Sequence, residues 1–462
     1  MGQSIGGDEV HGHKYEWPGD NRGATFNFGV GRLTLSPEET IALLAAHRAA
    51  VLTDTTHVDL RGVPLPRAAD GRRIDPHLSL ERVYVRLRAV REEGQRREEE
   101  ARRREIERQA DERDEAGLAG RLGDFFYADR TADRPDDSPI DPEVALREHG
   151  RMVILGPPGA GKSTLLRLLA RWAAADADGP LPLRVSLGHY AAQLSRGDAS
   201  LVDFALKDLP ERQRAAVGAA IELGNVLWLL DALDEAREHA PGVLAQLAAL
   251  PGQLVLTSRP LGYAPGSAAD LPHFDLLPLK SGDADVFLTN WFGALAETQG
   301  YDEAWVVSRV KATRTRLDDR PGLRALLSNP LLLTFVAVLA DRDPAEALPE
   351  HRAGLYRRYL EELLDSWEGT RRARAGAAEP AVGPLRGEAA RAALRDGVLW
   401  LGWWLHLTYY GGRASRPPLE REAIEALAEY LLAAADYDDL RRHEARAAAG
   451  DVVAFWRGAG LV

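Results

Sequence analysis

The sequence predicts an α/β protein with a parallel sheet core, an N-terminal α+β region before it and a C-terminal all-helical part after it. Short apolar runs alternate with helical stretches between residues 150 and 280, which is typical of a parallel sheet with crossover helices. One of these runs leads into a glycine-rich turn, and beyond residue 280 the pattern is helical. At 462 residues the chain is too long for one core, so about three units are expected.

Composition narrows the class of protein. Hydrophobic residues make up 45% and charged residues 28%, as in ordinary globular proteins. The sequence has no cysteine, which excludes disulfides, thiolate zinc sites and cysteine nucleophiles. A net charge of -12 is unlike that of a protein that grips phosphate backbones, so there is no strong nucleic-acid signal. No run reaches the roughly 18 to 20 apolar residues of a membrane span, and we expect a soluble, cytoplasmic protein with no membrane partner.

The first 149 residues divide into three stretches. Residues 1–35 are rich in Gly, Asp, Asn and His and are predicted to be an irregular N-terminal segment. Residues 36–125 form an N-terminal region of mixed secondary structure. Residues 126–149 form a polar, proline-containing linker, whose last part, 142–148, is predicted to be a short helix.

The N-terminal region begins with the first clear helix of the chain. Ser36 can cap it and Glu39 completes a capping box, and the helix runs to about residue 52. Short β-like pieces follow at 57–63 and 82–87. A charged helix is predicted at 91–115, where acidic residues outnumber arginines, so that we interpret it as a solvated spacer.

Five strands are expected in the central sheet. Each is a short apolar run bounded by turn or polar residues. The five runs are Met152–Leu155, Leu183–Leu187, Val226–Asp231, Leu254–Thr257 and Phe274–Leu277.

A glycine-rich turn follows the first strand. Residues 156–163 match the pattern G-x-x-x-x-G-K-[ST] between a strand and a helix. In such a P-loop the backbone N–H groups point at a phosphate, and the following helix adds its positive end. Lys162 would reach the β- and γ-phosphates of ATP or the phosphates of ADP, and the Ser163 hydroxyl would bind Mg²⁺. The predicted nucleotide-binding residues here are Gly156, Pro157, Pro158, Gly159, Ala160, Gly161, Lys162, Ser163 and Thr164.

The lysine at position 162 supports this interpretation. Only five of the 58 basic residues are lysines, so the chain uses arginine almost everywhere else. A compact ammonium suits a narrow phosphate site, whereas a guanidinium is broad and planar. The alternative, a chance glycine-rich turn, does not explain why this position carries lysine in a chain that otherwise uses arginine.

Acidic residues end the strand at 226–231. Asp231 would lie at the carboxyl edge of the sheet, where it could hold Mg²⁺ directly or through water. Glu235, about one turn further, could orient or deprotonate the attacking water, and Asp234 is a second catalytic candidate. An ordinary strand with a polar end is the alternative, and it fits poorly beside a P-loop.

An arginine follows the strand at 254–257. Arg259 could reach the γ-phosphate and report whether it is present. Taken alone, it would be interpreted as a surface arginine.

These three elements, in this order, resemble the NACHT family of signal-transducing P-loop ATPases. The resemblance is carried by Ile154–Thr164, Leu229–Glu235 and Thr257–Pro260, and the second stretch is the most diagnostic. Family members usually carry Gly at the position of Ala232. The resemblance implies a P-loop NTPase fold for the core.

The resemblance extends beyond the core. Asp283–Phe292 is similar to the family's helix after the fifth strand, although helix packing alone also explains its pattern. Leu326–Leu333 is similar to the segment whose proline packs near the adenine, which makes Pro330 a candidate nucleotide contact; Asn-Pro is also an ordinary helix start. The implied units are a NACHT core at 150–295, a helical domain at 296–345 and a helical, partly winged-helix region at 346–462.

The resemblance implies a switch. ADP would hold the units closed, and ATP with an unknown trigger would open them into a self-associated state that acts on an unknown effector. Slow hydrolysis would reset it, in bacterial signalling or anti-phage defence. A stretch like 453–462 normally continues into the rest of a winged helix, so we expect a fragment or a protein without its own sensor.

Two alternatives stay open. One is a remodelling ATPase of the AAA+ type, which hydrolyses ATP steadily and usually carries asparagine at the end of the fourth strand. The other is a nucleotide-bound scaffold with negligible turnover.

Overall fold

The computed structural model describes residues 35–58, 78–91, 139–194, 200–260, 263–318, 325–342, 348–349, 354–361, 364, 381–405, 407–408, 420–434, 437 and 440–458. Residues 1–34 of the predicted irregular segment, 92–115 of the predicted charged helix and 126–138 of the predicted linker lie outside these residues. Within the described part of the chain, none of the helices combines the length and the apolar character needed to cross a membrane.

The centre of the molecule is a six-stranded, mostly parallel sheet, so the prediction of an α/β core is confirmed. Its strands lie in the order β1-β6-β2-β5-β4-β3. Their bounds are β1 Ala89–Arg91, β2 Arg151–Leu155, β3 Leu181–Ser186, β4 Val226–Asp231, β5 Gln253–Ser258 and β6 His273–Leu276. The five predicted strands are the parallel ones, and β1 pairs antiparallel with β6 at the edge.

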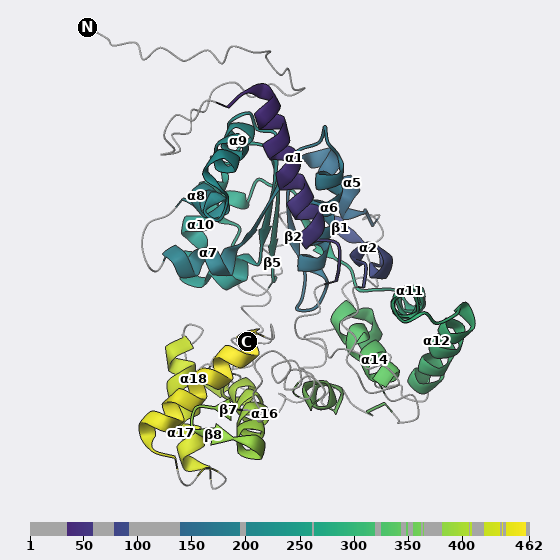
Figure 1. Cartoon of the computed structure of the whole chain (residues 1–462), viewed down its shortest axis with the longest axis vertical. Helices are drawn as coiled ribbons and strands as arrows, with labels where there is room; N and C mark the ends of the chain where they lie inside the picture. Colours follow the sequence, from purple (N-terminus) through teal and green to yellow (C-terminus); the bar gives the residue numbers. More distant parts are fainter. Residues whose placement is uncertain are drawn as a thin grey trace, which may run out of the picture.

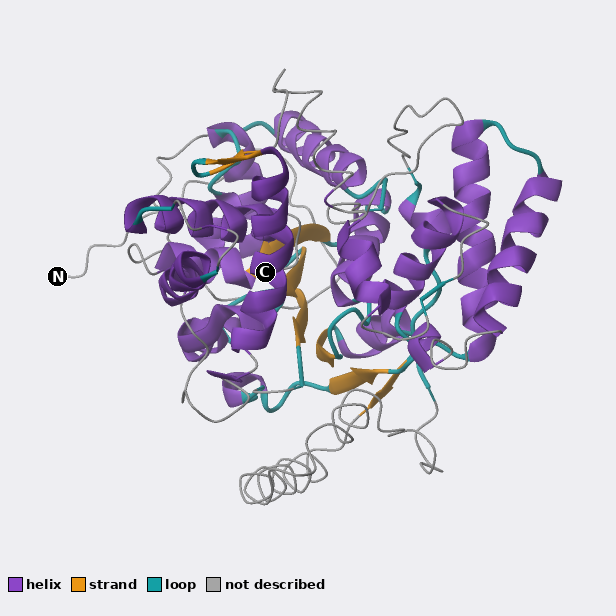
Figure 2. Cartoon of the chain, turned by 90° about the horizontal axis from the view of Figure 1, so that it is seen from below, coloured by secondary structure: helices purple, strands orange, loops and turns teal. Residues whose placement is uncertain are grey.

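Helices cover both faces of the sheet, and Figures 1 and 2 show the strands between them. Neighbouring residues of β2 point to opposite faces, so Ile154 packs with one hydrophobic cluster and Leu155 with the other. The first face is covered by α5 (Pro142–His149) and α6 (Lys162–Ala175). The second face is covered by α7 (Leu187–Leu194), α8 (Leu201–Leu206), α9 (Glu211–Glu222) and α10 (Ala240–Leu247).

The first helix, α1 (Pro37–Asp54), is docked onto this core. Ser36 and Glu39 form the predicted capping box at its start. The Arg48 guanidinium donates to the main-chain oxygens of Ala173, Gly179 and Pro180, between α6 and β3. Because these contacts join α1 to the sheet layer, the helix is part of the body that is built around the sheet, as Figure 1 shows.

One predicted β-like piece is wrong. Residues 82–87 do not form a strand: Leu80–Val83 is the short helix α2, and β1 begins only at Ala89. Leu80 and Val83, one turn apart, are both buried, so the apolar spacing here is that of a helix. Of the other predicted piece, His57 makes a single bridge with Ser79, and residues 59–63 lie outside the described part.

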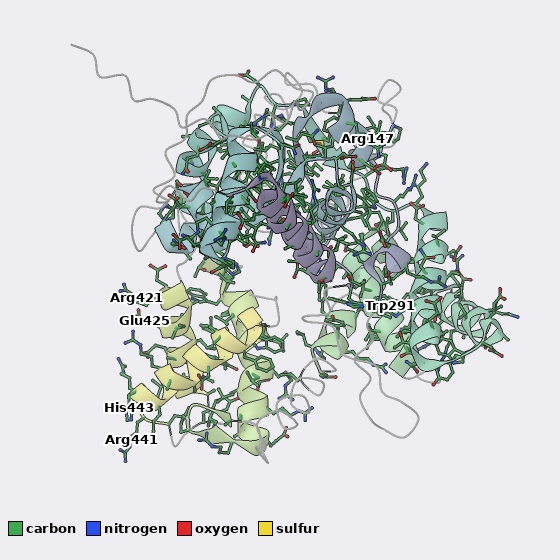
Figure 3. The ribbon with its side chains drawn as sticks, turned by 45° about the horizontal axis from the view of Figure 1, so that its top comes forward. Arg147, Trp291, Arg421, Glu425, Arg441 and His443 are labelled. Carbon is green, nitrogen blue, oxygen red and sulfur yellow. The ribbon has the colours of Figure 1, made fainter. Side chains whose placement is uncertain are left out.

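A helical part follows the sheet. It comprises α11 (Ser281–Gln299), α12 (Glu303–Asp318), the 3₁₀ turn η3 (Ala325–Ser328) and α14 (Pro330–Arg342). Trp291, labelled in Figure 3, is 3% exposed on α11 and stacks on Phe287 with ring centroids 5.8 Å apart. Core packing therefore explains the aromatic pattern of this helix.

The C-terminal part is not entirely helical, which corrects the prediction. Besides α16 (Gly387–Leu405), α17 (Glu420–Ala433) and α18 (Arg442–Gly458), it contains a hairpin of β7 (Ala381–Val382) and β8 (Leu385–Arg386). The hairpin packs between α16 and α18 (Figure 1). Strands of two residues are too short to show a period in the sequence.

Candidate functional site

The glycine-rich loop, residues 156–163, connects β2 to α6. Gly159 and Gly161 adopt φ values of 76° and 91°, in the left-handed region that favours glycine. Gly161 is the residue before the first turn of α6, so the loop turns directly into the helix N-terminus. The backbone conformation is thus one that the two glycines make possible.

Lys162 folds back over this loop. Its ammonium donates to the carbonyl oxygens of Gly156 at 2.7 Å and Pro157 at 3.1 Å. Burial, with a smaller contribution from nearby Arg259, lowers the pKa of this ammonium to about 8, against the opposing effect of Asp234, Asp231 and Glu235. In the part of the chain that the structure describes, Lys162 forms no ion pair. A half-buried cation bound only by carbonyls is a favourable place for an anion.

The strand order brings the predicted site residues together. Because β5 lies between β2 and β4, three strand ends meet beside the loop. The Gly156 N–H donates to the Ser258 carbonyl at 3.2 Å, which ties the loop to the end of β5. Ser163 lies exposed in the first turn of α6, and Thr164 is half-buried next to it.

Asp231 is held by a buried threonine. The Thr257 hydroxyl donates to Asp231 Oδ1 at 2.7 Å and accepts the Ala232 N–H at 3.0 Å. Thr257 is fully buried, whereas Asp231 is only partly so. Ala232 has a φ of 60°, the only positive φ of a non-glycine residue in the described chain. These contacts fix the direction in which β4 presents its terminal carboxylate.

Asp234 and Arg259 are paired with each other. The Arg259 Nε lies 2.9 Å from Asp234 Oδ2, and the Arg259 main-chain N–H donates to Asp234 Oδ1 at 3.0 Å. The arginine side chain is about half exposed, so part of its guanidinium remains open to solvent. Asp234 therefore lies in the site as the partner of Arg259.

Glu235 lies against α7. A Cβ at Gly188 would come within 2.7 Å of Glu235 Oε2 and 3.0 Å of Glu235 Cβ, so a larger residue there would push this side chain aside. Burial raises the pKa of the Glu235 carboxyl, and the negative charges of Asp234 and Asp231 raise it further. A carboxyl with a raised pKa beside other acids is suited to proton transfer.

Pro330 lies beside the loop, at the first position of α14. A Cβ at Gly161 would be 3.9 Å from Pro330 Cγ and 3.2 Å from Leu87 Cδ1. Leu331 N–H donates to the Gly159 carbonyl at 3.3 Å. The helical part thus reaches the glycine-rich loop through residues 329–331.

The residues present fit a phosphate group with a divalent cation. Lys162 offers a cation with no ion-pair partner among the described residues, α6 offers a positive end, and Asp231 and Ser163 offer oxygens that could bind a cation. Among the described residues, no group of three or more His, Asp or Glu side chains could hold a metal ion. Magnesium at such a site takes few protein ligands, with phosphate and water oxygens completing its shell.

Three features of the site were not predicted. These are the contact of Asn329 with the loop, the bond from Thr257 to Asp231, and the close approach of Gly188 to Glu235. The aspartate and the threonine end neighbouring strands, so their proximity could have been inferred from a correct strand order.

No family model matches the sequence, and no curated protein matches it either.

Proposed function

We propose that the protein is an ATP-binding switch of the NACHT kind, in which the glycine-rich loop is a P-loop. The observation that carries the proposal is Lys162, a half-buried cation with no ion pair in the described chain, whose ammonium folds back onto the loop that precedes α6. Asp231 ends β4, and Arg259 directly follows β5, the strand between β2 and β4. These positions agree with the roles that the motifs predict.

Each residue has a role in this proposal. The loop N–H groups and Lys162 bind the phosphates, and Ser163 and Asp231 hold Mg²⁺, which neutralises phosphate charge. Glu235 accepts a proton from the attacking water, and Arg259 exchanges part of its bond with Asp234 for the γ-phosphate. Pro330, carried by α14, contacts the nucleotide beside the loop.

The switch differs from its alternatives in what ATP does to the protein. ATP and ADP must bind the two conformations with different affinity, because a ligand that binds both equally shifts nothing. We expect the copurified nucleotide to be ADP. With ADP the protein should show a single molar mass, and with ATP and the trigger it should form a larger assembly. The proposal includes self-association of the protein and a role in cytoplasmic signalling or anti-phage defence.

Light scattering in ADP and in ATP, combined with a turnover assay, tests the proposal. Steady hydrolysis without a trigger would favour the remodelling ATPase, and binding without turnover or assembly would favour the scaffold. A molar mass that is the same in ADP and in ATP, together with steady turnover, would contradict the switch.

The variant Glu235→Gln separates binding from hydrolysis. We expect it to bind ATP as the wild type does and to hydrolyse it about 100-fold more slowly, within the range for loss of a general base. Glu211→Gln, at the exposed start of α9, is the matched control and should hydrolyse normally. Unchanged turnover in Glu235→Gln would remove Glu235 from the mechanism.

A further inference from the structure

The start of α14 is bonded directly to the glycine-rich loop. Asn329 Nδ2 donates to the Pro158 carbonyl at 3.0 Å, although the two residues are 171 positions apart in the sequence. The Leu331 N–H donates to the Gly159 carbonyl at 3.3 Å. Two consecutive carbonyls of the loop are therefore bound by the segment that begins α14.

The same asparagine also caps α14. Its Oδ1 accepts the N–H groups of Leu331 at 3.0 Å and Leu332 at 3.3 Å. Capping needs only an acceptor, which aspartate or serine would also supply, whereas the bond to Pro158 needs a donor. The partners fix the amide orientation, because the reverse would set NH₂ against two N–H groups and oxygen against a carbonyl.

The contact is also close packed. A Cβ at Gly159 would lie 2.7 Å from Asn329 Oδ1 and 2.8 Å from Leu331 Cβ. Real Cβ atoms are not found so close to such neighbours, so only glycine allows the loop to lie this close to the start of α14. A change in the loop must either move the start of α14 or break its bonds to the loop.

The geometry of the peptide unit links this contact to phosphate binding. The unit between Pro158 and Gly159 is planar and trans, so its N–H points opposite to the carbonyl that Asn329 binds. The hydrogen bond from Asn329 therefore fixes the direction in which the Gly159 N–H points. The next N–H, of Ala160, donates to the Pro157 carbonyl at 3.2 Å and closes a turn within the loop.

We propose that Asn329 is a positioning residue that couples the glycine-rich loop to α14. It orients the Pro158–Gly159 peptide for the phosphate and transmits occupancy of the loop to the start of α14. The proposal rests on the nucleotide site proposed above, and it names the contact through which that site would act on the helical part.

Two substitutions separate capping from coupling. Asn329→Asp keeps the capping acceptor, which a carboxylate at a helix N-terminus supplies well, but it loses the donor to Pro158. Asn329→Ala loses both. We expect Asn329→Asp to fold as the wild type does, which a thermal melt checks, and to bind ADP about two- to tenfold more weakly, the factor of one neutral hydrogen bond.

Hydrogen exchange with and without ADP measures the coupling. In the wild type, ADP should slow exchange in peptides covering both 156–163 and 331–336. In Asn329→Asp, ADP should still protect the loop, but its protection of 331–336 should fall by about threefold or more. Equal ADP-dependent protection of 331–336 in the two proteins would overturn the proposal.

The same exchange measurements test the role of Asn329 and the nucleotide site separately. If ADP slows exchange nowhere in the wild type, the nucleotide site is refuted. The coupling is then decided in the nucleotide-free protein, where Asn329→Asp should exchange faster than the wild type in peptides covering 156–161. Equal rates there would overturn the role of Asn329 as well.

Discussion

Thr257 shows how one buried hydroxyl can organise the acidic side of the site. It is fully buried and bonds both Asp231 and the Ala232 N–H. Thr257→Val keeps the shape but leaves these polar groups without their partner, so we expect a loss of about 1–3 kcal/mol in the free energy of unfolding. Denaturant unfolding measures it, and Thr257→Ser, which keeps the hydroxyl, is the control with a loss of about 1 kcal/mol from one methyl group. A Thr257→Val variant as stable as the wild type would show that the hydroxyl contributes nothing.

Ala232 gives a second prediction at the residue scale. An L-residue in the left-handed region costs about 1–2 kcal/mol, and the φ of Ala232 is 60°. Ala232→Gly removes this cost but adds about 0.4–1 kcal/mol of unfolded-chain entropy, so we expect no loss and up to about 1.6 kcal/mol of gain. Ala232→Val should be clearly less stable than either, because a β-branched residue disfavours this region. Chemical unfolding of the three proteins tests this order, and a valine variant as stable as the glycine variant would contradict it.

The site could be predicted from the sequence only in part. Its residues were found through local patterns, the glycine-rich loop above all, because each pattern follows a recognisable strand. The bonds between them could not be found in this way. Asn329 and Pro158 are far apart in the chain, and Asn329 by sequence alone is an ordinary residue before a helix.

At the scale of elements, α1 is held to the core by polar contacts. His47 is 9% exposed, and its Nε2 lies 3.0 Å from the Pro182 carbonyl, which can only accept, so the ring nitrogen carries the proton. Arg184 of β3 pairs with Asp54 at 2.7 Å near the other end of the helix. These contacts place α1 beside α6, the helix that follows the glycine-rich loop.

The docking of α1 should weaken in acid. Burial lowers the pKa of His47 from 6.5, so the unfolded chain takes up a proton at a higher pH than the folded one. The stability contributed by neutral His47 is present above the unfolded pKa and is lost as the pH falls through the folded pKa. We therefore expect the wild type to lose stability relative to His47→Asn as the pH falls from about 7.5 to 5.

Urea unfolding over this pH range makes the comparison. His443→Asn, on the exposed outer side of α18 (Figure 3), is the matched control and should follow the wild type. A difference between wild type and His47→Asn that does not change with pH would show that His47 titrates alike in the folded and unfolded chains.

The strands illustrate why some elements could be predicted and others could not. The five parallel strands are buried on both faces, so each is a continuous apolar run that stands out from its neighbours. The edge strand β1 has three residues, and β7 and β8 have two each, so none of them contains a measurable period. These short strands form through tertiary pairing, which for β1 is its pairing with β6.

In the whole molecule, the glycine-rich loop lies where the sheet meets the helical part. β2 and β5 bind it from the sheet, and residues 329–331 bind it from α14. Figure 1 shows α14 adjoining the end of the sheet body. A ligand at the loop would therefore contact both bodies, which is the arrangement that a switch needs.

The most direct test of the account is the affinity of the protein for Mg²⁺-ATP and Mg²⁺-ADP. Titration of a fluorescent nucleotide into wild type, Lys162→Ala and the exposed-lysine control Lys207→Ala makes the comparison. We expect binding by wild type and Lys207→Ala, and a loss of about 100-fold or more in Lys162→Ala, because the bound phosphates would lose the ammonium that pairs with them. The same affinity in Lys162→Ala as in the wild type would contradict it.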